Sequence, residues 1–358
     1  MSSYCFRVTA PSAGAWGSVS LGGCVPIHRV NGGHSPPYES LSPPRGLWYN
    51  SRRIGMSTLF FEGDTMSQSK SVAARRTIRS GVLFLCLAGW LLVVGCATRQ
   101  PSAAGKAVRI YIVTDLEGAS GVYQFAQTRE AGPLNDKAKE YLMGDIAAVV
   151  RGLRAGGATD IVVLDGHGSG AFVPDLMGPG AKYITGKPRS GPLTELDGSF
   201  AGMVQVAAHA MNGTADGVLC HTQSSKTENR YWYNGVESGE QAQCAAIAGG
   251  YGVPTIMVTG DEAACREAHK FFGPDCVTVA VKRGLSREAA ELYPFDEVRQ
   301  ALYQGAKRAV AAIAKCQPYK LSLPIQAKRE YLVFDEPGKP RKVTKEGTID
   351  DVLKLLSF

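Results

Sequence analysis

An alternation of apolar, strand-like runs with amphipathic, helix-like segments constrains the fold more than any other feature of the chain. VRIYIVTD at 108–115 is almost continuously apolar, which is typical of a strand buried on both faces of a parallel sheet. Residues 136–157 then carry apolar side chains at helical spacing and end at paired glycines, and DIVVLD at 160–165 repeats the strand pattern. This βαβ order predicts an α/β fold with a mainly parallel sheet and flanking helices.

The same pattern continues along the chain. We expect further strands at 203–209, 217–222, 254–261 and 276–282, and further helices at 238–249, 262–271, 286–292 and 296–315. A single domain over 108–320 accounts for all of these elements, and 321–358 remains as a C-terminal appendage.

The positive charge of the chain lies outside this predicted domain. Of the formal net charge of +7, residues 1–95 hold nine Lys and Arg against three acids, whereas 96–358 hold 30 against 29. Because binding to nucleic acid needs a basic surface, we expect no nucleic-acid partner. The 44% of hydrophobic and 20% of charged residues are typical of a chain with a core, which excludes a disordered or fibrous class.

The segment 66–95 has the form of a bacterial export signal. Basic residues precede the apolar run GVLFLCLAGWLLVVG, which at 81–95 is shorter than the roughly 20 residues that a membrane-spanning helix needs. The run ends at Cys96, as in lipoproteins whose first mature residue is a lipidated cysteine. We therefore predict a lipoprotein signal peptide at 66–95, a lipid anchor at Cys96 and a tether at 96–107. An uncleaved membrane anchor is the alternative.

This signal affects how the ends and the cysteines of the chain are interpreted. A secretory signal does not work 65 residues into a chain, so we expect translation to start at Met66 or Met56 and residues 1–65 not to be native. We expect the protein in the cell envelope, facing the periplasm and anchored to the outer membrane. The expected mature fold has five cysteines, an odd number that implies no full disulfide framework. Cys265 and Cys276 are a candidate pair in an oxidising compartment.

Acidic and histidine residues stand where the predicted strands end. In open α/β sheets, ligands bind outside the carboxyl ends of the strands, so we expect these side chains to meet. Asp115 and Glu117 lie two residues apart on an extended segment and therefore point to the same side. The other candidates at strand ends or at a helix start are Asp165, His167, His209, His221 and Glu240.

Together these residues favour a catalytic metal site. Carboxylates and imidazoles without a thiolate pair suit Zn²⁺ or Mn²⁺ in a site with open positions. One carboxylate usually bridges the metals of a two-metal hydrolase, and Asp115 is the candidate bridge. A lone Asp or His at a strand end is more often a cap or a hydrogen-bonding residue, so the hypothesis depends on the whole set. Cys220 is not expected to act as a nucleophile with His221, because neighbours on a strand point to opposite faces.

Six segments carry a resemblance to a known family. They resemble, in order and at similar spacing, the zinc-dependent D-aminopeptidase (DppA-like) family: TDLEG (114–118), DGHG (165–168), AAHA (207–210), GVLCHT (217–222), NGVESGE (234–240) and YGVPTIMVTGDE (251–262). The resemblance covers about 108–320. It implies an α/β fold, two zinc ions per chain and a homo-oligomer, in the family a ring-stacked decamer that encloses a channel.

The resemblance also assigns roles to single residues. It implies that Asp115 bridges the two metals, with one metal held by Glu117 and His167. It implies that the other is held by His209 and Glu240, and that His221 is a catalytic residue beside the metals. The chain has Val113 and Cys220 where the family has Ser, and neither position is a metal ligand.

The sequence thus predicts a lipid-anchored, two-metal aminopeptidase that hydrolyses short peptides and releases N-terminal D-amino acids. Zn²⁺ is the expected metal, with Mn²⁺ as an alternative. Two other functions stay open: a non-catalytic periplasmic binding lipoprotein that uses the same cleft, and a metal-dependent amidase or esterase on the same scaffold. Metal content separates the first of these from an enzyme.

Overall fold

A computed structural model describes residues 107–168, 170–336 and 338–358. The predicted signal peptide, Cys96 and nearly all of the tether lie outside the described residues, so these predictions stay predictions. Within the described ranges, no helix has both the length and the apolar character needed to cross a membrane.

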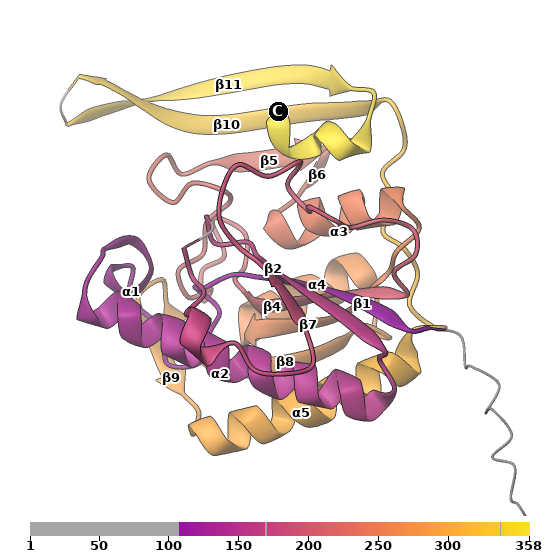
Figure 1. Ribbon diagram of the computed structural model, residues 1–358. Helices are drawn as coiled ribbons and strands as arrows, with labels where there is room; N and C mark the ends of the chain where they lie inside the picture. Colours follow the sequence, from indigo (N-terminus) through magenta and orange to yellow (C-terminus); the bar gives the residue numbers. More distant parts are fainter. Residues whose placement is uncertain (1–106, 169, 337) are drawn as a thin grey trace, which may run out of the picture. The chain divides into compact units, whose positions relative to one another are not determined.

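The larger of two sheets has seven strands in the order β3-β2-β1-β4-β7-β8-β9 (Figure 1). The strands from β3 across to β8 pair in parallel, and β9 pairs antiparallel with β8. Its members are β1 (Arg109–Thr114), β2 (Asp160–Asp165), β3 (Lys182–Ile184), β4 (Gly202–Ala208), β7 (Thr255–Asp261), β8 (Val277–Ser286) and β9 (Ala289–Leu292). The predicted α/β class with a mainly parallel sheet is confirmed.

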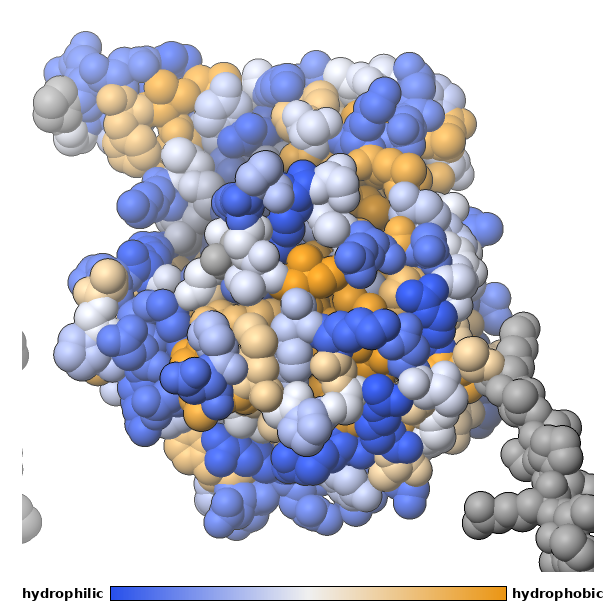
Figure 2. All heavy atoms as spheres, in the orientation of Figure 1, coloured by the Kyte–Doolittle hydropathy of each residue, from blue (hydrophilic) through white to orange (hydrophobic). Residues whose placement is uncertain are grey.

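Helices cover both faces of this sheet. Along β1, Ile110 and Ile112 pack in one core cluster and Tyr111 and Val113 in the other, because successive side chains of a strand alternate between faces. The first cluster includes α2 (Pro133–Gly156) and α5 (Phe295–Ala312), and the second includes α3 (Glu240–Gly250) and α4 (Glu262–Phe272). In the view of Figure 2 the surface over α2 and α5 is mainly hydrophilic, as expected for amphipathic helices. The short helices are α1 (Ala126–Arg129) and the 3-10 turns η1 (Pro174–Leu176) and η2 (Val352–Ser357).

The C-terminal residues belong to a second, antiparallel sheet. Its order is β11-β10-β5-β6, formed by β5 (Arg230–Tyr233), β6 (Val236–Glu237), β10 (Ile325–Glu336) and β11 (Lys339–Ile349). Ala327 of β10 pairs with Tyr233 of β5, so the hairpin of the predicted appendage joins a strand from the middle of the chain. The boundary between 108–320 and 321–358 remains a prediction.

Two predicted elements are wrong. Residues 217–222 form turns rather than a strand, because Leu219 has a positive φ of 53° and the N–H of Val218 donates to the Asp261 carboxylate instead of to a strand partner. Residues 286–292 form the end of β8, a tight turn and all of β9 rather than a helix. The segment 282–286 pairs with 289–292 as two antiparallel strands. In the first segment a long-range contact outweighs the local sequence signal, and in the second the pairing of adjacent strands does so.

All five cysteines of the described residues are free, so the structure does not form the candidate Cys265–Cys276 disulfide.

Candidate metal centre

The predicted site residues gather where the order of strands reverses. The chain passes from β1 outward to β2 and β3 and then returns to β4 on the other side of β1. Such a reversal opens a crevice at the carboxyl ends of the two central strands. Asp115 directly follows β1 and His209 directly follows β4, so these two residues stand on either side of the crevice.

The backbone approaches closely at this point. The N–H of Asp115 donates to the carbonyl of Val206, and the N–H of Gly118 donates to the carbonyl of Ala207, both across the crevice. A Cβ at position 118 would lie 2.1 Å from the carbonyl oxygen of Ala208, so only glycine fits there. Ala207 itself has a positive φ of 59°, a conformation that costs free energy and is typical of functional sites.

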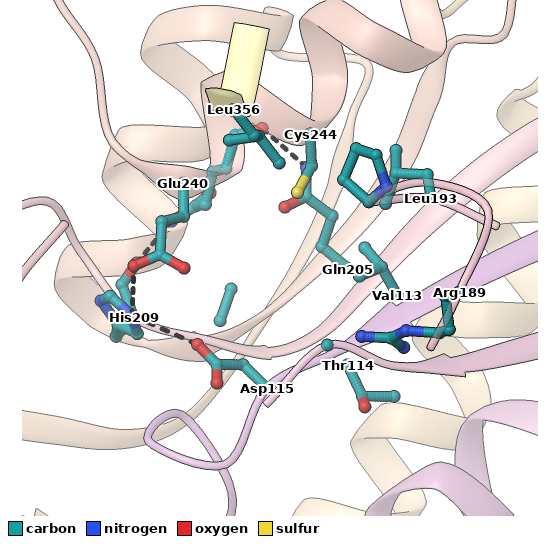
Figure 3. Close-up of a pocket in the computed structure, with 14 residues that line it drawn as sticks. Val113, Thr114, Asp115, Arg189, Leu193, Gln205, His209, Glu240, Cys244 and Leu356 are labelled. Carbon is teal, nitrogen blue, oxygen red and sulfur yellow. Dashed lines mark hydrogen bonds and ion pairs between the residues drawn. The ribbon is translucent and has the colours of Figure 1, made fainter. Parts of the chain in front are cut away.

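Asp115 faces both halves of the site. Its Oδ1 lies 3.0 Å from Nδ1 of His167. Its Oδ2 lies 3.2 Å from Nε2 of His209, and Figure 3 shows Asp115 beside His209 and Glu240. Oε2 of Glu117 also lies 3.0 Å from the His167 nitrogen, and Oε1 of Glu240 lies 3.4 Å from the His209 nitrogen. The four neighbouring residues therefore form two pairs. Glu117 and His167 lie on the Oδ1 side of Asp115, and His209 and Glu240 lie on its Oδ2 side.

Main-chain carbonyls orient three histidines. His167 Nε2 donates to the carbonyl of Thr128, His209 Nδ1 to that of Ala210, and His221 Nδ1 to that of Leu219, at 2.8 to 3.0 Å. Since a carbonyl can only accept, each of these nitrogens carries a proton, and the other nitrogen of each ring faces the acids. Metal-binding histidines are commonly oriented in this way.

The charges of the cluster are strongly coupled. Burial would raise the pKa of Glu117 and Glu240, but the adjacent histidines outweigh it, so that the pKa of Glu117 lies well below its usual value and that of Glu240 falls to about 2. Burial would lower the pKa of His167 and His209, but the carboxylates raise the first to about 12 and the second well above its usual value. Burial, followed by the charge of His209, lowers the pKa of His221. Each acid and the histidine beside it therefore stabilise each other's charged form.

Two buried atoms of the cluster fit metal coordination. Among the described residues, Oε2 of Glu117 and Nε2 of His209 have no hydrogen-bond partner although both are buried. Such atoms are costly unless something binds them, and carboxylate oxygen with imidazole nitrogen is a donor set that suits Zn²⁺. The residues present therefore fit a metal ion.

The structure brings six of the seven candidate residues together, whereas Asp165 lies outside both groups and accepts from the N–H of Ala171 and the hydroxyl of Thr185. Two groups have ligand atoms close enough to share an ion: Asp115, Glu117 and His167 in one, and His209, His221 and Glu240 in the other. His221 stacks on His209 with ring centroids 4.0 Å apart, and its Nε2 lies 3.8 Å from Glu240. Cys220 lies outside the cluster and its thiol donates to the carbonyl of Thr214, although it sits in a turn rather than on the expected strand.

Sequence reasoning missed Lys282, which is fully buried on β8. Its Nζ donates to the carbonyls of Glu117 (2.7 Å), Ala119 (2.9 Å) and Val122, so one ammonium group holds the loop that carries Glu117. Burial lowers the pKa of Lys282 to about 8. The signal that could have found Lys282 is a lysine at the end of the apolar pattern predicted as a strand at 276–282.

Two cavities meet at the cluster, and Asp115 and Glu240 line both. The first, of about 220 Å³, has a largely apolar wall that includes Val113, Leu193 and Leu356, and Figure 3 draws its lining. The second, of about 300 Å³, is polar and is lined by Thr128, Arg129, Ser224, Ser225 and Lys226 among others. A substrate bound at the cluster can therefore extend to either side of it.

Residues 108–334 match the peptidase family M55, described as D-aminopeptidase. The chain belongs to this family of D-aminopeptidases. A solved structure, the Zn-dependent D-aminopeptidase DppA from Bacillus subtilis, described as a self-compartmentalizing protease, is similar to this M55 chain with a TM-score of 0.65 and 22% identity. The match covers 70% of this chain and 94% of that chain, and at this identity it concerns the fold. No curated protein matches the sequence. The sequence motifs predicted a resemblance to this family, and the family match confirms it.

Proposed function

We propose that this D-aminopeptidase holds two zinc ions and releases N-terminal D-amino acids from short peptides. One observation carries the proposal: the two oxygens of Asp115 face two separate pairs of ligand residues. A carboxylate in this position is the usual bridge of a two-metal hydrolase. In this proposal Glu117 and His167 complete one site, and His209 and Glu240 complete the other.

The ions and the side chains have separate tasks. Bound zinc would polarise the scissile carbonyl and lower the pKa of a water molecule. His221 has its Nδ1 proton fixed on the Leu219 carbonyl, so its Nε2 is free to take a proton from the water and pass it to the leaving amine. The closely packed ring of His209 holds His221 at this place.

DppA is Zn-dependent, which supports zinc as the metal, and Mn²⁺ suits the same oxygen and nitrogen donors. D-alanyl-D-alanine and D-alanyl-glycyl-glycine are the substrates that we propose. A protein outside the cytoplasm meets peptidoglycan peptides, which are a local source of D-amino acids.

We also propose that the chain is lipid-anchored through Cys96, faces the periplasm on the outer membrane, and assembles into a homo-oligomer. DppA is described as self-compartmentalizing, which supports an assembly, with a decamer as the size implied by the family. Mass spectrometry of the membrane fraction should find a lipidated N-terminal Cys96. A soluble product that starts at Met1 would refute the anchor.

The direct test of the function compares matched D- and L-dipeptides with metal-free and zinc-loaded protein. We expect release of D-Ala from D-alanyl-D-alanine at least several-fold faster than release of L-Ala from its enantiomer, loss of activity on chelation, and recovery with Zn²⁺ or Mn²⁺. Faster turnover of the L-series would overturn the D-specificity. A protein that binds peptides but hydrolyses none would be the binding lipoprotein instead.

A further inference from the structure

Arg189 places a positive charge in the first cavity. It lies in the segment between β3 and β4, is half-buried, and lines the same cavity as Asp115, His209 and Glu240. Figure 3 shows its guanidinium on the side of the cavity opposite His209 and Glu240. The charge therefore faces the space into which a substrate bound at the cluster extends.

The guanidinium is fixed in place but is not neutralised by the protein. Its Nη1 donates to the carbonyl of Asp165 at 2.7 Å, which ties it to the end of β2. Within the described ranges no carboxylate forms an ion pair with it, whereas Arg287, another arginine near the site, is paired with Glu228 at 2.9 Å. A guanidinium has five N–H donors in a rigid fork, so most of those of Arg189 remain available.

The cavity combines this charge with an apolar wall and a small volume. Val113, Leu193 and Leu356 contribute hydrophobic surface, and the volume of about 220 Å³ is below the range of roughly 300 to 1,000 Å³ typical of sites for drug-sized ligands. A small ligand with a short apolar side chain and a carboxylate fits such a cavity. The carboxylate would form a bidentate, charge-assisted pair with Arg189.

We propose that Arg189 binds the C-terminal carboxylate of the peptide and so restricts this enzyme to very short substrates with a free C-terminus. The inference rests on the proposed function, because the scissile bond has to lie at the Asp115 cluster. Each additional residue lengthens an extended chain by about 3.3 to 3.6 Å, so a fixed anchor beside the cluster selects peptide length. Peptides just long enough to reach from the cluster to Arg189 are favoured over longer peptides.

The second cavity is lined by two other cationic side chains that a substrate carboxylate could contact. Arg129 and Lys226 line it, but both are exposed, and the guanidinium of Arg129 lies over the ring of Phe125 at 3.3 Å. Solvent screens exposed charges, so they contribute less to binding a carboxylate than a half-buried guanidinium does. The effect of Arg189→Gln is therefore compared with that of Arg129→Gln.

The test uses two substrates that differ only in the charge at the C-terminus, D-alanyl-D-alanine and D-alanyl-D-alaninamide, with the zinc-loaded full-length protein. We expect the wild type to prefer the free acid, and Arg189→Gln to lower kcat/KM for the acid by about 10- to 100-fold, mainly through KM, with little change for the amide. Arg189→Lys keeps the charge without the fork and should recover part of the preference. Arg154→Gln is the matched control, because Arg154 also donates to main-chain carbonyls but lies outside both cavities.

Three results would overturn the proposal: equal rates of the wild type on acid and amide, equal losses on both substrates in Arg189→Gln, or loss of the preference in Arg129→Gln rather than in Arg189→Gln. Calorimetric binding of the same two ligands to His221→Ala protein, with and without Arg189→Gln, separates this inference from the proposed function. Binding that requires both the carboxylate and Arg189 supports the inference even if the wild type hydrolyses neither ligand. Binding that is indifferent to Arg189 contradicts it.

Discussion

At the scale of single residues, the site depends on which ring nitrogen of each histidine faces the acids. The carbonyls of Thr128, Ala210 and Leu219 each take one histidine N–H, so the opposite nitrogens face the acids. The same rule holds for the predicted ligands His167 and His209 and for the predicted catalytic residue His221. The tautomer alone therefore does not distinguish a metal ligand from a proton carrier. Substitution of the histidine distinguishes these two roles.

We predict that His221→Ala keeps the bound metal while kcat falls by roughly 10²- to 10⁴-fold, the range for losing a general acid or base. The reason is that each predicted ion has its ligands without His221. The measurements are metal content by mass spectrometry and kcat with D-alanyl-D-alanine. A fall in metal content together with activity would make His221 a ligand.

Most of the cluster could be predicted from the sequence, because Asp115, Glu117 and His209 directly follow apolar strand patterns. Parallel strands bring their carboxyl ends to one edge, so the pattern also predicts proximity. Arg189 could not be found in this way, because it lies in an irregular segment between strands, where no periodicity fixes its direction. Its position depends on a bond to the Asp165 carbonyl that only the fold reveals.

At the scale of elements, buried polar side chains hold the loop after β1 in place. Lys282 donates from β8 to three carbonyls of this loop, and Asp145 on α2 accepts the N–H of Ser120. Glu117 is thus positioned by two elements on which it does not lie.

Lys282→Met should destabilise the fold and weaken the site. It leaves the buried carbonyls of Glu117 and Val122 without a donor, whereas that of Ala119 keeps the N–H of Val122, so we expect a loss of at least about 2 kcal/mol in the free energy of unfolding. Urea unfolding measures this loss. Arg283→Met is the control on the same strand, where an exposed pair with Glu291 is worth under about 1 kcal/mol. Equal losses in both variants would show that Lys282 does not organise the loop.

Asp145 predicts a specific pH dependence of stability. Burial raises its pKa to about 6, above the value of 3.8 in an unfolded chain. The folded state then binds more protons than the unfolded state between pH 4 and 6, so the contribution of this group falls as pH rises through that window. Asp145→Asn still offers an oxygen to Ser120 and removes the titration. Between pH 4 and pH 7, the free energy of unfolding of Asp145→Asn should rise relative to that of the wild type by up to about 3 kcal/mol, as measured by urea unfolding. A constant difference between the two proteins across this range would contradict the shift.

Local signals failed where tertiary contacts decide the structure. The apolar residues at 217–222 suggested a strand, but the Asp261 carboxylate takes the N–H of Val218 and stabilises a turn. The helix-forming residues at 286–292 are instead used in the β8–β9 hairpin. The contact of Val218 with Asp261 joins residues 43 positions apart, which no short window contains. The β8–β9 hairpin lies within residues 282–292, and its helix-forming residue types led to the wrong prediction.

At the scale of the whole molecule, the order of strands makes the site. The reversal between β1 and β4 brings Asp115 and His209 together, and the start of α3 adds Glu240. The C-terminal residues contribute as well, since Leu356 of η2 lines the first cavity beside residues from β1. The alternation of strands and helices predicted the sheet, whereas the pairing of β10 with β5 had no sequence signal.

The central claim is that Asp115 serves two metal ions, and metal stoichiometry tests it most directly. Wild type, Asp115→Ala and Glu240→Ala are loaded with zinc, dialysed and analysed for zinc per chain, with circular dichroism to check that each variant is folded. We expect two ions in the wild type, about one in Glu240→Ala and almost none in Asp115→Ala, because a bridge serves both ions and a terminal ligand serves one. Wild-type zinc content in folded Asp115→Ala would show that Asp115 does not bridge two ions.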